Sequence, residues 1–452
     1  MHMTECIPVE AYIDTNEPAQ RVLAELLRPG KRGDGMGSAQ QSATGTRPSG
    51  DGTERTGEAQ TGRYAGASTG VLQANGVGEE DMVQLLDAGG TRHADGTFSP
   101  YIDALDAETL RGFYADMATV RRFDAEATAL QRQGELALWV PVVGQEAAQI
   151  GSGRAMRPAD YAFPTYREHG VALTRGLDLA DLLALFRGVS NGGWDPREKN
   201  FHLYTLVLAA QTLHAVGYAM GIQRDLVADP ATEPAAVVAY FGDGASSEGD
   251  VHESMVFAAS YNAPVVFFCQ NNNWAISVPF EVQSKIPLVN RAGGYGFPGI
   301  RVDGNDVLAV YAVTQWALEH ARDGRGPVLI EASTYRVGAH TTADDPTKYR
   351  LNAEEESWKA KDPLARLETY LRAADLADDA FFDQVKNDDD ELAAHVRQAT
   401  LALGGADIRQ KFATVYAEAH PLVAEELAWF ENYEASFADA DTQASTTQGG
   451  AA

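Results

Sequence analysis

Cysteine and basic residues are both scarce in this sequence. Cys6 and Cys269 are the only cysteines among 452 residues, so no disulfide framework is expected and a reducing cytoplasm is the predicted compartment. Lys and Arg together number 36 against 64 Asp and Glu, which gives a formal net charge of -28. Because a chain this acidic is repelled by nucleic acid and by anionic lipid, we expect neither as a partner.

Long apolar runs are absent as well. No stretch is long enough to cross a bilayer, and the first ten residues, MHMTECIPVE, have neither the basic start nor the apolar core of a signal peptide. Large apolar side chains are almost missing from residues 30–78, so this segment cannot bury enough surface to offset its ordering entropy. We therefore predict a largely disordered extension over residues 1–80 and a disordered tail over 439–452.

Several common nucleotide and metal motifs are missing too. The P-loop pattern GxxxxGK[ST] does not occur, and the third glycine of a dinucleotide fingerprint starting at Gly242 is replaced by Ser247. The His-Glu pair at 252–253 lacks the second histidine of the zinc motif HExxH. Residues 188–192 match the GxSxG pattern of hydrolases, but they follow a helix-like segment and not a strand, so we interpret them as a helix-ending turn.

What the sequence does contain is an alternation of apolar strands and helices. Strands are predicted at 237–241, 264–269 and 328–335, and helices at 108–134 and 209–222. Such alternation predicts an α/β fold with a mostly parallel sheet flanked by helices. The carboxyl ends of the three strands should then lie together at one edge of the sheet.

The C-terminal part is predicted to be mostly helical. The acidic run at 388–391 is interpreted as the start of a helix, ELAAHVRQATLAL, because negative charge suits a helix N-terminus. Residues 301–306 are interpreted as a strand end, a tight turn and a helix cap. We predict a diphosphate-binding domain over 81–380 and a helical segment over 381–438.

Residues 242–272 carry the most chemical information. They read GDGASSEGDVHESMVFAASYNAPVVFFCQNN and join one apolar strand to the next through a turn and a helix. Gly242 and Gly244 would let the backbone turn sharply and approach a phosphate without an obstructing Cβ. Ser246 and Ser247 are expected to cap the helix that follows.

Two polar residues near the strand ends could bind a metal. Asp243 follows the first strand and Asn272 the second, so both would lie at the same sheet edge. Together they can offer oxygen ligands to one small divalent cation, as magnesium on a diphosphate requires. The alternative is an ordinary Asp-Gly turn and an Asn-rich loop, but GDG paired with NN across a βαβ pattern favours the metal.

The pairing of GDG with NN resembles the signature of thiamine-diphosphate enzymes. More closely, roughly residues 100 to 430 are similar to the alpha subunit of the decarboxylating component of 2-oxo acid dehydrogenase complexes. The resemblance implies a thiamine-diphosphate-binding fold in which magnesium is held by Asp243, Asn272 and the backbone carbonyl of Trp274. It also implies that the diphosphate is lined by Gly242, Gly244 and Ala245.

A second segment similar to the family contains Tyr166 and Arg167. It matches the family's YRE stretch, whose Tyr and Arg contact the diphosphate, and an arginine forks onto phosphate oxygens while staying charged. From the residues alone, Arg167 would be interpreted as a surface ion-pair residue. Leu208 aligns with the bulky apolar residue on which the cofactor bends, and from the residues alone it could equally be a core leucine.

The loop at 334–350 resembles the family's active-site loop, closest to the branched-chain type. His340 would lie near the cofactor and aid acyl transfer to the lipoyl group, since imidazole exchanges protons near neutral pH. From the residues alone it could equally be a loop histidine with a local hydrogen bond. The resemblance implies that the loop is ordered by Arg336, Asp344, Tyr349 and Arg350.

The chain departs from the family pattern at several positions. Gln270 stands where the family often has an arginine before the paired asparagines, so one phosphate contact is expected to be missing. Trp274 replaces the usual tyrosine and Asn273 a common glycine. Thr341 occupies the position of a regulatory serine in animal relatives.

The family's chemistry also needs a glutamate that protonates the pyrimidine ring of the cofactor. No segment here resembles the domain that supplies it, and Glu146, in GQEAAQ, follows no strand of such a domain. The resemblance therefore implies an α2β2 heterotetramer whose beta subunit contributes that glutamate, and a lipoylated transacylase that accepts the acyl group. The implied function is oxidative decarboxylation of a branched-chain 2-oxo acid with thiamine diphosphate and magnesium.

Other functions stay open at this point. Alpha subunits of pyruvate or acetoin dehydrogenases share these motifs, but they often carry a GGSMH segment where this chain has KNFHLYTLVLAA. A cofactor-free assembly subunit would not need the four polar residues Asp243, Asn272, Arg167 and His340. A self-sufficient decarboxylase would turn over substrate as the purified chain alone.

Overall fold

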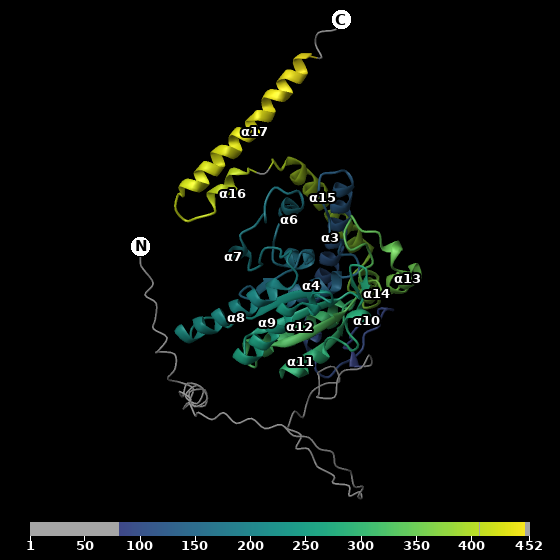
Figure 1. Ribbon diagram of the computed structural model, residues 1–452. Helices are drawn as coiled ribbons and strands as arrows, with labels where there is room; N and C mark the ends of the chain where they lie inside the picture. The colour runs from purple at the N-terminus through teal and green to yellow at the C-terminus, as the bar shows by residue number, and fades with distance from the viewer. Residues whose placement is uncertain (1–80, 406, 448–452) are drawn as a thin grey trace, which may run out of the picture. The chain divides into compact units, whose positions relative to one another are not determined.

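A parallel five-stranded sheet forms the centre of the structure. The computed structural model describes residues 81–405 and 407–447, so the extension predicted over residues 1–80 lies outside the described residues (Figure 1). The strand order is β1-β2-β3-β7-β6, and every neighbouring pair is parallel. The predicted α/β fold is confirmed. The strands are β1 (Tyr161–Phe163), β2 (Val237–Gly242), β3 (Val265–Asn271), β6 (Gly299–Asp303) and β7 (Val328–Ser333).

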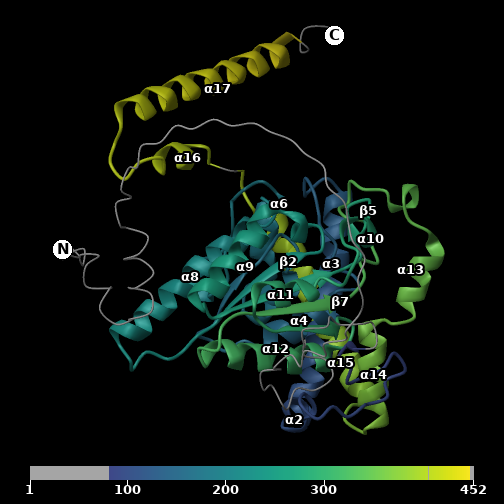
Figure 2. The ribbon, with the colours of Figure 1, turned by 60° about the horizontal axis from the view of Figure 1, so that its bottom comes forward.

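Helices cover both faces of this sheet (Figure 2). Alternate residues of a strand point to opposite faces, so in β2 Tyr240 packs toward α4 and α12 whereas Phe241 packs toward α8 and α9. Because both faces are covered, the central strands are mostly apolar, with Glu331 in β7 and the last two residues of β3 as buried polar exceptions. These four helices are α4 (Glu146–Ala155), α8 (Ala210–Ala228), α9 (Gly249–Tyr261) and α12 (Val307–Arg322).

The other elements surround this layered centre. Two short strands pair antiparallel, β4 (Trp274–Ala275) and β5 (Val278–Pro279). No helix in the part of the chain that the structure describes is long and apolar enough to cross a membrane. The remaining helices are α2 (Ser99–Asp103), α3 (Ala107–Arg132), α5 (His169–Thr174), α6 (Leu179–Phe186), α7 (Pro196–Lys199), α10 (Phe280–Gln283), α11 (Asn290–Tyr295), α13 (Asn352–Lys359), α14 (Pro363–Ala373), α15 (Asp379–Ala402), α16 (Arg409–Ala413) and α17 (Pro421–Thr447).

The carboxyl ends of β2, β3 and β7 lie at one edge of the sheet, as predicted. Gly242 at the end of β2 pairs in register with Gln270, and Asn271 at the end of β3 pairs with Ser333. The turn and cap predicted at 301–306 are confirmed, because Asp306 accepts hydrogen bonds from the first backbone N–H groups of α12. The helix-ending turn predicted at 188–192 is confirmed by Gly188, whose φ is 75° directly after α6.

Three local predictions differ from the structure. Ser246 and Ser247 do not cap α9: they lie in a 3-10 turn, and the helix begins at Gly249 with no side-chain cap. The acidic run at 388–391 does not open a helix, because α15 already starts at Asp379. Helix α17 continues past residue 439, where a tail was predicted; residues 448–452 lie outside the described residues. The domain boundary at residue 380 stays a prediction.

Candidate active site

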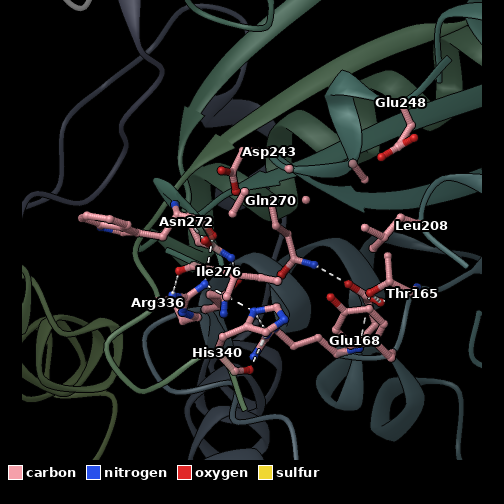
Figure 3. Close-up of a pocket in the computed structure, with 18 residues that line it drawn as sticks. Thr165, Glu168, Leu208, Asp243, Glu248, Gln270, Asn272, Ile276, Arg336 and His340 are labelled. Carbon is pink, nitrogen blue, oxygen red and sulfur yellow. Dashed lines mark hydrogen bonds between the residues drawn. The ribbon is translucent and has the colours of Figure 1, made fainter. Parts of the chain in front are cut away.

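A cavity of about 280 Å³ lies at the carboxyl ends of β2 and β3 (Figure 3). All ten residues predicted to bind cofactor or metal line it: Tyr166, Arg167, Leu208, Gly242, Asp243, Gly244, Ala245, Asn272, Trp274 and His340. They come from five separate stretches of the chain, and the fold brings them together. The cavity is completed by Gln145, Thr165, Glu168, Glu248, Gln270, Ala275, Ile276 and Arg336.

Asp243 follows β2 and is almost completely buried, with 1% of its surface exposed. Burial raises the pKa of its carboxyl to about 6, despite the nearby positive charge of Arg336. Within the described part of the chain, its side-chain hydrogen bond comes from a neutral amide, Gln283 Nε2, at 3.2 Å. A buried carboxylate with so little compensation is suited to a cation.

The asparagine turn after β3 presents two more oxygen atoms. Asn272 donates from Nδ2 to Gln145 Oε1 at 3.1 Å, and its Oδ1 accepts the N–H of Trp274 at 3.3 Å. The carbonyl oxygen of Trp274 accepts a hydrogen bond from Arg336 Nη1 at 2.9 Å. This bond uses one of the two lone pairs of the oxygen. Gln145 Nε2 is buried without a hydrogen-bond partner, so this wall of the cavity retains an unused donor.

Of the two reasons predicted for the glycines of the GDG turn, the structure contradicts the sharp turn. Neither is among the residues with positive φ, so the sharp turn does not require glycine. A Cβ on Gly244 would lie 2.8 Å from the Cβ of Ala275, so glycine is needed there for close packing. A Cβ on Gly242 would meet its nearest protein atom, Gln270 O, at 3.9 Å, an ordinary van der Waals distance, and Gly242 lines the cavity, so the approach of a phosphate there stays a prediction.

Arg167 is buried, with 6% of its surface exposed, which excludes the surface ion-pair interpretation. Its guanidinium donates to the carbonyls of Pro141 and His340, the second through Nη2 at 3.0 Å. Burial lowers its pKa to about 10, so it keeps its positive charge at neutral pH. A positive charge that is hydrogen-bonded to carbonyls and lines the cavity is suited to an anion.

His340 is held by two guanidinium groups. Its Nδ1 lies 3.3 Å from Arg167 Nη2 and 3.4 Å from Arg336 Nη1. Because a guanidinium only donates, Nδ1 accepts and the ring proton resides on Nε2. Burial, followed by the charges of these two arginines, lowers the pKa of His340 to about 3, so the imidazole is neutral at pH 7.

The loop around His340 is ordered by the residues predicted to do so. Asp344 Oδ2 accepts the N–H of His340 at 2.8 Å and the hydroxyl of Tyr349 at 2.5 Å. Arg350 Nη1 donates to the carbonyl of Arg336 at 2.6 Å and thus closes the loop on itself. His340 is therefore fixed through both its ring and its backbone.

Gln270, the position of the expected missing arginine, belongs to a neutral network in the floor of the cavity. Its Nε2 donates to Glu168 Oε1 at 2.7 Å, and its Oε1 accepts from Gln149 Nε2 at 3.2 Å. Glu168 also accepts the N–H and the hydroxyl of Thr165, and burial raises its pKa. The amide therefore satisfies a buried carboxylate and adds no charge to the cavity.

A further buried carboxylate, Glu146, lies outside the cavity. Glu146 is fully buried, pairs with Arg121 at 2.8 Å and does not line the cavity, in agreement with its rejection as the catalytic acid. Among the described residues, no group of three or more His, Cys, Asp or Glu side chains could hold a metal alone. A cation at Asp243 would therefore need amide, carbonyl and ligand oxygens, as magnesium on a phosphate group does.

Comparison with known proteins agrees with this geometry. Residues 114–402 match the family model described as Dehydrogenase E1 component. The chain is 46% identical over 342 residues to the 3-methyl-2-oxobutanoate dehydrogenase subunit alpha of Mycobacterium tuberculosis, covering 75% of this chain and 91% of the relative. It is 37% identical over 322 residues to the pyruvate dehydrogenase E1 component subunit alpha of Staphylococcus epidermidis (71% and 84% covered), and 39% identical over 293 residues to that of Staphylococcus aureus (64% and 76% covered).

Proposed function

The chain belongs to the dehydrogenase E1 component family, and from this membership we propose that it is the alpha subunit of a branched-chain 2-oxo acid dehydrogenase. The reaction is the oxidative decarboxylation of a 2-oxo acid such as 3-methyl-2-oxobutanoate, with transfer of the acyl group to a lipoyl arm. The observation that carries the proposal is the single cavity that unites Asp243, Asn272, Arg167 and His340. The identity of 46% to a branched-chain relative, against 37% and 39% to pyruvate relatives, supports the substrate class.

The residues of the cavity fit thiamine diphosphate and magnesium. The buried, barely compensated carboxylate of Asp243 and the buried charge of Arg167 are matched by a cation and an anion, respectively. Magnesium would be held by Asp243, Asn272 and the Trp274 carbonyl. The diphosphate would be held by Tyr166, Arg167, Gly242, Gly244 and Ala245, with Leu208 beneath the bent cofactor. When bound, thiamine diphosphate supplies the electron sink for the electrons left as carbon dioxide departs.

His340 would act as a neutral hydrogen-bond donor. With Nδ1 fixed by Arg167 and Arg336, the Nε2–H is the group left to contact a reactant. This atom can donate to a lipoyl sulfur as the acyl group is transferred, which agrees with the predicted role of His340. The role requires no positive charge on the imidazole at neutral pH.

The cavity is half of an active site. Three carboxylates line it among the described residues: Asp243, Glu168 and Glu248. Asp243 is assigned to the metal, and Glu168 is fully engaged by Thr165 and Gln270. Glu248 precedes the first turn of α9, on the side of the diphosphate. We therefore propose that a beta subunit supplies the acid for the pyrimidine ring, in an α2β2 enzyme that passes its acyl group to a lipoylated transacylase.

Replacing Asp243 tests the metal and cofactor assignment directly. In the chain co-purified with its beta subunit, Asp243→Ala should abolish binding of thiamine diphosphate with magnesium, measured by titration calorimetry. Asp250→Ala is the matched control, because Asp250 lies in the first turn of α9 and does not line the cavity. Unchanged affinity in Asp243→Ala would overturn the assignment.

A further inference from the structure

Glu331 is a buried carboxylate for which the proposed reaction has no use. It lies in β7, between β3 and β6, and none of its surface is exposed. It does not line the cavity. Its two oxygens accept from neutral donors, Oε1 from Asn271 Nδ2 and Oε2 from the N–H of Val289, both at 2.8 Å. Its in-register neighbour on β6 is Arg301, so a positive charge lies beside it in the sheet, but its two hydrogen bonds go to the segments that carry Asn271 and Val289.

Its first oxygen holds the turn that carries the metal-facing groups. Asn271 uses Nδ2 for Glu331, and its Oδ1 accepts the N–H of Asn273 at 3.2 Å. Asn273 has φ of 69° and donates from Nδ2 to the carbonyl of Thr334 at 3.0 Å. A non-glycine residue at positive φ needs such fixed contacts, and here they follow from the orientation of the Asn271 carboxamide. This turn presents Asn272 and the Trp274 carbonyl to the cavity.

Its second oxygen holds the segment on the other side of Asp243. Val289 is the residue before α11, and residues on both sides of it contact the acidic turn. Gln283 donates to Asp243 Oδ2 at 3.2 Å, and Arg291 Nη1 donates to the carbonyl of Ser246 at 2.6 Å. One carboxylate therefore connects the two chain segments that enclose Asp243 and Asn272.

We propose that Glu331 is a positioning residue for the metal site. Through Asn271 on one side and Val289 on the other, it would hold in place the turn of Asn272 and Trp274 and the segment that contacts Asp243, which are the groups that would bind the cation. Magnesium demands near-ideal geometry, so a small displacement of one ligand weakens its binding. The inference rests on the proposed function, because it needs a metal bound at Asp243 and Asn272.

Exchanging the acid and the amide between positions 331 and 271 provides the variants that test this proposal. In Glu331→Gln, the new amide can accept from one of its two donors, and its NH2 group opposes the other. Asn271→Asp alone places a second carboxylate against Glu331. The double variant reverses the polarity of the bond: the amide at 331 donates to the carboxylate at 271, which still accepts the N–H of Asn273, while the amide oxygen accepts from Val289. Glu126→Gln is the matched control, since Glu126 on α3 is buried, pairs with Arg122 of the same helix and Arg397 of α15, and does not line the cavity.

The test is the affinity of the assembled αβ enzyme for Mn²⁺, measured by electron paramagnetic resonance with thiamine diphosphate present. Glu331→Gln should weaken Mn²⁺ binding by about tenfold or more, as loss of an outer-shell partner does, and raise the KM for metal with little change in kcat at saturating metal. The double variant should recover the affinity, including where Glu331→Gln fails to assemble. Glu126→Gln should bind Mn²⁺ as the wild type does even if its thermal stability falls.

Two results would overturn the inference: wild-type Mn²⁺ affinity in Glu331→Gln, or a double variant that binds Mn²⁺ no better than the single variants. A wild-type enzyme that binds no Mn²⁺ would instead contradict the proposed function itself, so the two failures are distinguishable.

Discussion

At the scale of single residues, His340 is kept neutral by its neighbours. Its pKa of about 3 arises first from burial and then from the charges of Arg167 and Arg336. Because this pKa is far below the working range, protonation of His340 contributes no inflection to activity between pH 5 and 8. A free histidine, with an ordinary pKa of 6.5, would contribute one.

Arg336→Met should make the reaction sensitive to pH. The variant removes one positive charge from the Nδ1 side of His340, so the pKa of the imidazole rises above about 3, while burial and Arg167 keep it below the ordinary 6.5. As pH falls toward this raised pKa, protonation should displace Arg167 from Nδ1 and change the rate of lipoyl acylation at a higher pH than in the wild type. The measurement is the pH–rate profile of the overall reaction, with the exposed Arg325→Met as control. Coincident profiles for Arg336→Met and wild type would contradict this account of His340.

Residue roles that follow a local motif were predictable, and those that depend on distant segments were not. Asp243 and Asn272 lie at strand ends whose positions follow from apolar runs, so the sequence predicted their convergence. No motif marks the segments that contain Glu331, Gln283 and Gln145, whose contacts lie in or next to the site. Nothing in GQEAAQ, the segment that contains Gln145, indicates that this residue contacts Asn272.

At the scale of elements, the segment 139–144 supports the active-site loop from one side. The N–H of Val337 donates to the carbonyl of Val143 at 3.1 Å, and the N–H of Thr342 donates to that of Trp139 at 2.9 Å. Gly144 makes this approach feasible, with φ of 96° and a position where a Cβ would lie 2.3 Å from the carbonyl oxygen of Tyr335.

Gly144→Ala should therefore destabilise the enzyme far more than a comparable glycine change. The clash is with backbone, which cannot move aside, and it adds to the strain of positive φ, so we expect a loss of about 2–4 kcal/mol. Gly134→Ala is the control, because Gly134 has φ of 82° and no atom within 4 Å of the added Cβ, and should cost about 1 kcal/mol. Thermal unfolding of the assembled enzyme measures both. Equal midpoints for the two variants would show that the close approach at Gly144 is not needed.

Elements were predictable where local pattern and packing agree. Strands β2, β3 and β7 were expected from apolar runs, but β1, only three residues long, is hidden in an aromatic patch. Helix α15 begins before its acidic run, at Asp379, because Asp378 caps it by accepting the N–H of Phe381. The acidic run lies inside the helix and contacts α3: Asp389 accepts from Thr119 at 2.6 Å, and Asp390 pairs with Arg122 at 2.9 Å. The charge pattern of the sequence alone does not indicate which distant residues these aspartates contact.

At the scale of the whole molecule, we propose that the described chain provides the groups that bind metal and diphosphate and the imidazole of His340, but not the acid for the pyrimidine ring. This division is the central claim: the cavity at the sheet edge is one wall of an active site whose other wall belongs to a beta subunit. Neither the fold nor the motifs determine the substrate side chain, because that part of the pocket would be shared with the partner.

The most direct measurement is decarboxylation of 3-methyl-2-oxobutanoate by the purified chain, by its beta subunit and by the two together, with thiamine diphosphate and magnesium present and pyruvate as the comparison substrate. We predict turnover only when the two subunits are combined, and a higher kcat/KM for 3-methyl-2-oxobutanoate than for pyruvate. Turnover by the chain alone, or no turnover by an assembled enzyme that has bound its cofactor, would contradict the account.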